Sequence, residues 1–118
     1  MINRQSLSKE QVLYAINNKE FPDEIIKSAN KVVVIMTQDW CPQWQDLQKW
    51  VYDIDTNEDI NIYDVIYNNT DYFDEFRNFK ENVWGNRLIP YLRYYQDGKL
   101  INESNYVNEQ KFKEILQI

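Results

Sequence analysis

From residue 31 to residue 49 the chain reads KVVVIMTQDWCPQWQDLQK. Residues 32–37 are almost continuously apolar and rich in β-branched side chains, which is typical of a strand buried on both faces. Residues 42–52 carry apolar side chains at helical spacing, and Pro42 is well suited to the first helical position. The only cysteine of the chain, Cys41, therefore lies between a central strand and the start of a helix.

Cys41 is the one candidate nucleophile. At a helix start, unpaired backbone N–H groups and the positive end of the helix dipole favour the thiolate, the reactive form of cysteine. We expect the N–H groups of Gln43 and Trp44 to point back toward the sulfur. Asp39 opposes the thiolate as a like charge. The alternative is that Cys41 is a small buried apolar residue, the commonest environment of a free cysteine.

The rest of the chain predicts alternating helices and strands. Ser8 and Gln11 form a capping-box pattern before the first helix, and the only two glycines, Gly85 and Gly98, indicate positive φ. Helices are expected over residues 9–17, 22–29, 42–52, 70–81 and from 108 onward, and strands over 32–37, 60–67, 91–95 and 99–102. This predicts a single α/β domain over residues 1–118, with residues 1–20 as its helical N-terminal extension and helices on both faces of a mixed sheet.

Composition excludes several functions. The net charge of −6 argues against a nucleic-acid partner, and no apolar run reaches the ~20 residues of a membrane span. The N-terminus lacks the apolar core of a signal peptide. The absence of histidine excludes His-based metal sites and Cys–His dyads. A lone cysteine fits a reducing compartment. We expect a cytoplasmic monomer with no metal, no cofactor and no membrane partner.

A second segment, far along the chain, helps to interpret the segment around Cys41. Residues 83–101 read VWGNRLIPYLRYYQDGKLI. Together the two segments resemble the thioredoxin family: the Trp-Cys-x-x start, the aromatic-Gly-x-Arg-x-Ile-Pro run and the Asp-Gly-Lys turn follow in family order and spacing. The resemblance covers residues from about 20 to the C-terminus. It implies a thioredoxin-like fold, with a mixed central sheet and helices on both faces.

Two departures from the family concern the mechanism. Trp44 stands where thioredoxins have their second cysteine, the thiol that resolves a mixed disulfide, and an indole cannot do this. Ile35 stands where they bury an aspartate that handles protons. Both losses predict that the chain is not a dithiol reductase. Trp44 either packs in an apolar helix stripe or forms an aromatic wall for a bound peptide or low-molecular-weight thiol.

The resemblance also implies a substrate-binding surface. The family proline that matches Pro90 is cis and lies beside the active-site sulfur, and the backbone before it pairs with an extended substrate segment. The pairing residue here would be Ile89, and Tyr91 replaces the usual threonine. The residues expected to bind substrate are Trp40, Trp44, Ile89, Pro90 and Tyr91.

Two functions of different class remain open. In the first, Cys41 forms a mixed disulfide with a client protein or a low-molecular-weight thiol, and an external thiol completes the cycle. The turn then resembles that of glutaredoxins and monothiol bacilliredoxin-like proteins, and the chain would be a monothiol oxidoreductase. In the second, the chain is a redox-inactive binding module that holds a peptide or partner protein beside Pro90. A purely structural subunit or an oligomer is a third interpretation.

Overall fold

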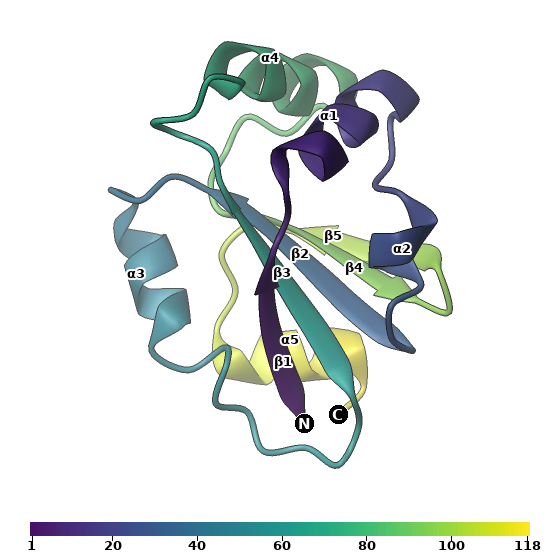
Figure 1. The fold of residues 1–118 in the computed structure, drawn as a ribbon. Coiled ribbons are helices and arrows are strands. Elements are labelled where there is room, and N and C mark those ends of the chain that lie inside the picture. Colours follow the sequence, from purple (N-terminus) through teal and green to yellow (C-terminus); the bar gives the residue numbers. More distant parts are fainter.

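Figure 1 shows a five-stranded sheet with helices on both faces, in a computed structural model that describes residues 1–118. The predicted α/β fold with a mixed sheet is confirmed. The elements, in chain order, are β1 (Ile2–Ser6), α1 (Lys9–Asn18), α2 (Asp23–Ile26), β2 (Lys31–Thr37), α3 (Pro42–Gln48), β3 (Ile60–Ile66), α4 (Phe73–Asn78), the π-helix η1 (Phe79–Val83), β4 (Tyr91–Gln96), β5 (Lys99–Ser104) and α5 (Glu109–Leu116).

The strand order is β1-β3-β2-β4-β5. Strands β1, β3 and β2 run parallel, whereas β4 is antiparallel to both β2 and β5. All residues of the central strand β2 are buried, as its apolar sequence predicts. Because β4 pairs Tyr91 with Met36, it begins where β2 ends. The segment after β2 and the segment before β4 therefore meet at the same end of these two neighbouring strands.

Each face of the sheet has its own core. Side chains alternate along β2, so that Val34 and Met36 face one side while Val33 and Ile35 face the other. Helices α1, α2 and α4 cover the first face, and α3 and α5 cover the second (Figure 1). Cys41 belongs to the second core. None of the helices is long and apolar enough to cross a membrane.

The first twenty residues differ from the expected helical extension. Residues Ile2–Ser6 form β1, which pairs with β3 along the edge of the sheet. Only one of its five side chains is strongly apolar, because an edge strand is held by backbone bonds and leaves much of its surface in water. The strand therefore has no periodic signal in the sequence. The capping box of Ser8 and Gln11 that begins α1 is confirmed.

Three predicted helices have different bounds. The helix expected over residues 22–29 covers only Asp23–Ile26, with Pro22 as its N-cap residue. The helix after Cys41 ends at Gln48 instead of continuing to residue 52. The helix expected over residues 70–81 begins at Phe73, because the Thr70 hydroxyl donates to the Tyr67 carbonyl instead of capping a helix. It then widens into the π-helix η1. Lys80 lies inside the protein, one helical turn beyond the buried Phe76, at a position where the residue type and not the spacing is unexpected.

Candidate functional site

Cys41 is the N-cap residue of α3, directly after the loop that leaves β2. Its side chain is 4% exposed and belongs to the core between the sheet and α3. The sulfur makes no hydrogen bond with the N–H groups of Gln43 and Trp44. Its polar contact is with the carbonyl of Ile89, to which Sγ donates at 3.9 Å. A protonated thiol donates, so it turns toward an acceptor and not toward the N–H groups of the helix start.

The segment before β4 brings Pro90 to this thiol. The Ile89–Pro90 peptide bond is cis. The amide of Asn105 donates to the Pro90 carbonyl at 3.0 Å and forms a reciprocal amide pair with Asn86. The backbone around the proline is thus tied to the end of β5, while its Ile89 carbonyl faces Cys41. The structure therefore brings Cys41, Ile89 and Pro90 together, although the sequence separates them by almost fifty residues.

Two of the residues expected to bind substrate are core residues. Trp44 is 1% exposed and packs edge-on against Tyr52, and Tyr91 is fully buried. Burial raises the pKa of Tyr91, whose hydroxyl donates to Glu103. Of the two interpretations of Trp44, the structure supports packing. Neither ring can form the wall of an open binding surface, because each is enclosed by the sheet and the helices that cover it.

Trp40 lies on the surface as a binding residue would. Its side chain is 60% exposed, and its indole N–H donates to the Gln38 side chain at 2.7 Å. Leu88 is 64% exposed and precedes Ile89 in the loop before β4. Trp40 directly precedes Cys41, and Leu88 directly precedes Ile89, so each is next in sequence to one partner of the contact between the thiol and the carbonyl. Single exposed apolar residues are ordinary on protein surfaces, and the position of this pair makes it notable.

The loop before Cys41 is held by amides from the loop after β3. The backbone N–H of Asp39 donates to the side chain of Asn68 at 2.9 Å, and the Asn68 amide donates back to the Asp39 carboxylate at 2.7 Å. Asn69 adds a longer bond to the same carboxylate. The sequence predicts only that Asp39 opposes the thiolate. The structure shows that Asp39 fastens the Cys41 turn through these hydrogen bonds.

The loop before Pro90 is held by Lys80, a residue that the sequence analysis does not identify. The side chain of Lys80 is completely buried, and its Nζ donates to the carbonyls of Asn86 at 2.8 Å and Leu88 at 2.9 Å. Burial lowers the pKa of Lys80 to about 8. Its spacing from Phe76 fits the buried face of the helix, but its residue type does not, since a lysine on a helix is normally exposed to solvent.

A buried carboxylate lies one strand away from the position of the family aspartate. Ile35 occupies that position on β2, and its register partner on β3 is Asp64, which is 5% exposed on the same face. Asp64 accepts hydrogen bonds from Ser6 at 2.8 Å and from the Tyr52 hydroxyl at 3.1 Å, and it pairs with Arg4. The donors around this carboxylate show that it joins β1 to β3.

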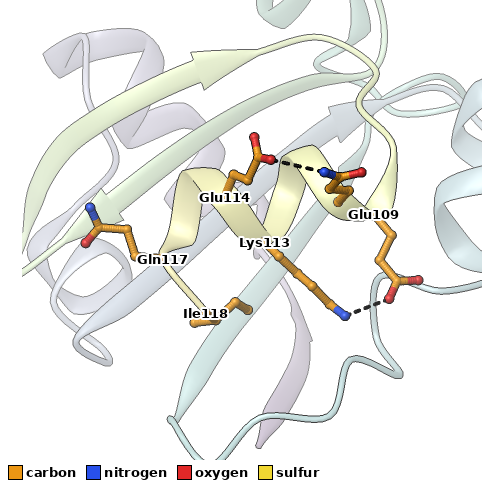
Figure 2. Close-up of a pocket in the computed structure, with 6 residues that line it drawn as sticks. Glu109, Lys113, Glu114, Gln117 and Ile118 are labelled. Carbon is orange, nitrogen blue, oxygen red and sulfur yellow. Dashed lines mark hydrogen bonds and ion pairs between the residues drawn. The ribbon is translucent and has the colours of Figure 1, made fainter.

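The larger surface depression, of about 430 Å³, is away from Cys41. Figure 2 shows that residues of α5 and the C-terminus line it, with Lys113 paired to Glu109 at 2.9 Å. Both members of that pair are partly exposed, so the pair contributes little to stability. No group of three or more Cys, Asp or Glu side chains is arranged to hold a metal ion.

Comparison of the whole chain with known proteins gives a result at the level of the fold. No protein-family model matches the sequence, and no curated protein sequence matches it significantly. Solved structures match over nearly the whole chain. A mutant thioredoxin from Halobacterium salinarum NRC-1 is 19% identical, with a TM-score of 0.62, and the match covers 98% of this chain and 88% of that one.

Two further matches come from plants. Oxidized thioredoxin O1 from Arabidopsis thaliana is 14% identical, has a TM-score of 0.68, and is matched over 97% of this chain and 95% of its own. A buckwheat glutaredoxin in complex with glutathione is 15% identical, with a TM-score of 0.56 over 94% of this chain and 91% of that one. The chain therefore has a thioredoxin-like fold, as its two motif segments predict.

Proposed function

We propose that this protein takes part in thiol–disulfide exchange through Cys41 as its one thiol, and that it is not a dithiol reductase. The observation that carries the proposal is the contact of Cys41 Sγ with the Ile89 carbonyl, 3.9 Å apart, beside the cis bond to Pro90. This contact sets a thiol next to a backbone segment that can pair with an extended substrate. No other cysteine is present to resolve a disulfide within the chain.

The proposed reaction has two exchange steps. Cys41 loses its proton to solvent, and the thiolate attacks a disulfide of a client protein or of a low-molecular-weight thiol. A sulfur–sulfur bond to Cys41 forms, the original disulfide bond breaks, and one half of the disulfide leaves as a thiolate. An external thiol then attacks the mixed disulfide, forms a new disulfide with the bound half and returns Cys41 to its free form.

The partner is either of two thiol sources. A client protein would present an extended segment to Ile89, whereas a low-molecular-weight thiol would need only the sulfur and its immediate surroundings. The buckwheat glutaredoxin with the same fold is a complex with glutathione, which supports the second source. We further propose that the chain acts as a single-domain monomer in the cytoplasm, where a free thiol such as Cys41 persists.

The experiment compares native protein, urea-unfolded protein and Cys41→Ser at neutral pH, with glutathione disulfide as the probe and intact mass as the readout. The native chain is expected to gain one glutathione faster than the unfolded chain. The Cys41→Ser variant should keep its fold and gain none. In an insulin reduction assay with a thioredoxin reductase system, the wild type should show negligible activity. Native modification no faster than that of the unfolded chain would overturn the proposal.

A second candidate function is a binding module without redox chemistry. It is favoured by the 4% exposure of Cys41, against 60% for Trp40 and 64% for Leu88 beside it. These two apolar side chains would contact a peptide that pairs with Ile89, and the thiol would only pack beneath it. Under this alternative, Cys41→Ser leaves peptide binding unchanged, whereas Trp40→Ala weakens it.

A further inference from the structure

Lys80 is buried in a way that lysine rarely is. Its side chain has no exposed surface, yet no carboxylate forms an ion pair with its ammonium. A buried charge without partners is very unfavourable, so the groups that Nζ does contact must offset a large cost. Two of its three N–H donors go to the carbonyls of Asn86 and Leu88, and the ring of Tyr91 lies 5.8 Å from Nζ.

All these contacts lead to one loop. The backbone carbonyl of Lys80 accepts a hydrogen bond from the Asn86 N–H at 3.0 Å, so side chain and backbone bind the same segment. Residues 85–90 belong to no helix or strand, and they rely on such bonds for their shape. Within the loop, the Asn86 side chain accepts from the Leu88 N–H at 3.1 Å. Lys80 therefore binds this loop through both its side chain and its backbone.

The geometry of a trans peptide unit carries this effect to Ile89. The Leu88 carbonyl and the Ile89 N–H belong to one planar unit and point in opposite directions. Lys80 draws the Leu88 carbonyl inward, so the Ile89 N–H is turned away from the protein interior. That N–H donates to no acceptor within the protein. The next carbonyl, that of Ile89, faces Cys41 Sγ.

We propose that Lys80 is a positioning residue for the Cys41 site: by holding the carbonyls of Asn86 and Leu88 inward, its ammonium presents the free N–H of Ile89 to an extended peptide that reacts with the thiol. This inference rests on the proposed function of Cys41. Under this inference, a residue outside both motif segments determines which disulfides react with Cys41. Peptide disulfides use the Ile89 N–H, whereas small disulfides without a peptide backbone do not.

The test compares wild type with Lys80→Met, which keeps the length of the side chain and removes its donors. Lys111→Met is the matched control, because it removes the same charge from an exposed position on α5. The rate of mixed disulfide formation is measured with a short peptide disulfide and with hydroxyethyl disulfide. Lys80→Met should lower the rate with the peptide about tenfold and leave the rate with hydroxyethyl disulfide within about threefold.

Amide hydrogen exchange of Asn86 and Leu88, whose N–H groups are hydrogen-bonded in this loop, supplies a readout that needs no reaction. Exchange should be about tenfold faster in Lys80→Met and unchanged in Lys111→Met. Lys80→Gln retains a nitrogen donor and should give intermediate values, which also serves if the methionine variant folds poorly. An unchanged ratio of the two disulfide rates together with unchanged exchange overturns the inference, and so does an equal fall in both rates.

Failure of the proposed function has a different signature. If wild-type protein reacts with neither disulfide, the thiol proposal is wrong, and hydrogen exchange then decides the role of Lys80 alone. Faster exchange in Lys80→Met, with weaker binding of a reduced form of the same peptide, supports positioning for the binding module. Exchange equal to that of the wild type contradicts it.

Discussion

Two loops meet at Cys41, and they are held in opposite ways. The loop from β2 is fastened from outside, by the reciprocal pair of Asp39 and Asn68, whose side chains are at the surface. The loop into β4 is fastened from inside, by the buried ammonium of Lys80. An exposed bond competes with water and contributes little net energy, whereas a buried charged donor cannot be removed without leaving carbonyls unpaired. The thiol therefore lies between a loop held by exposed hydrogen bonds, which are weak, and a loop held by buried ones, which are costly to break.

The difference bears on function because the two loops supply different parts of the site. We call residues 38–41, between β2 and α3, the outer loop, and residues 84–90, between η1 and β4, the inner loop. The outer loop carries the sulfur and the exposed ring of Trp40. The inner loop carries the backbone of Ile89, which under the proposed function must keep a constant direction to pair with a substrate. A rigid support under the backbone and a looser one beside the sulfur suit a site that recognises main chain and tolerates varied side chains.

The largest expected effect is on pH dependence, and it comes from the inner loop. The folded pKa of Lys80 is about 8 and its unfolded value is 10.5, so the unfolded state binds more protons between these values. Stability therefore rises with pH across this window. Relative to Lys80→Met, the wild type should gain about 2 kcal/mol in unfolding free energy between about pH 7 and pH 9.5. Urea titration at each pH measures this difference.

The comparison with Lys80→Met is needed because other groups titrate nearby. Glu81 favours the charged form of Lys80, and burial raises the pKa of Tyr91, Tyr95 and Tyr52 in the folded protein. Those tyrosines lower stability as the pH approaches about 10, because the unfolded chain loses their protons first. Their contribution is common to both proteins and cancels. Parallel pH curves for the wild type and Lys80→Met would show that Lys80 is charged equally in both states.

A smaller effect is expected from the outer loop. Replacing Asn68 with alanine removes the two hydrogen bonds to Asp39, and it should lower the unfolding free energy by about 1 kcal/mol. Asn57→Ala is the matched control, since Asn57 is exposed and its side chain makes no hydrogen bond. Urea unfolding gives the free energies, and alkylation of Cys41 with iodoacetamide reports on the turn. If Asn68→Ala lowers the unfolding free energy by about 3 kcal/mol or more, the outer loop is held as firmly as the inner loop, and the contrast between them is wrong.

The contrast between the loops also explains what the sequence could and could not predict. The fold follows from the strand before Cys41 and the run before Pro90, because both depend on local patterns of apolar, proline and glycine residues. Gly85 and Gly98 do adopt positive φ, as expected of the only two glycines. The supports of the site depend instead on contacts between distant residues, such as Asp39 with Asn68, for which a single sequence carries no signal.

Burial marks the second limit of the sequence. A tryptophan at helical spacing fits both the core and a binding wall, and only packing against Tyr52 decides for the core at Trp44. Lys80 is the reverse case, because its charged residue type predicts exposure although its spacing from the buried Phe76 fits the core. The sequence does not predict the strand β1, because four of its five residues are polar and its pairing with β3 is made by the backbone.

The smallest effect on stability is expected at the most exposed residue of the outer loop. Trp40 is 60% exposed and is held by one hydrogen bond from its indole to Gln38, so Trp40→Ala should change the unfolding free energy by less than about 0.5 kcal/mol. The same substitution should lower the rate of reaction with a peptide disulfide much more strongly. The ring is already exposed next to Cys41 in the chain, so a peptide can bury its apolar surface without any change in the core. Urea unfolding and the rate of reaction with a peptide disulfide measure the two quantities on the same samples. A variant that loses more than about 1 kcal/mol while reacting at the wild-type rate would show that Trp40 supports the loop, and Leu88 and the backbone at Ile89 would then remain to bind a substrate.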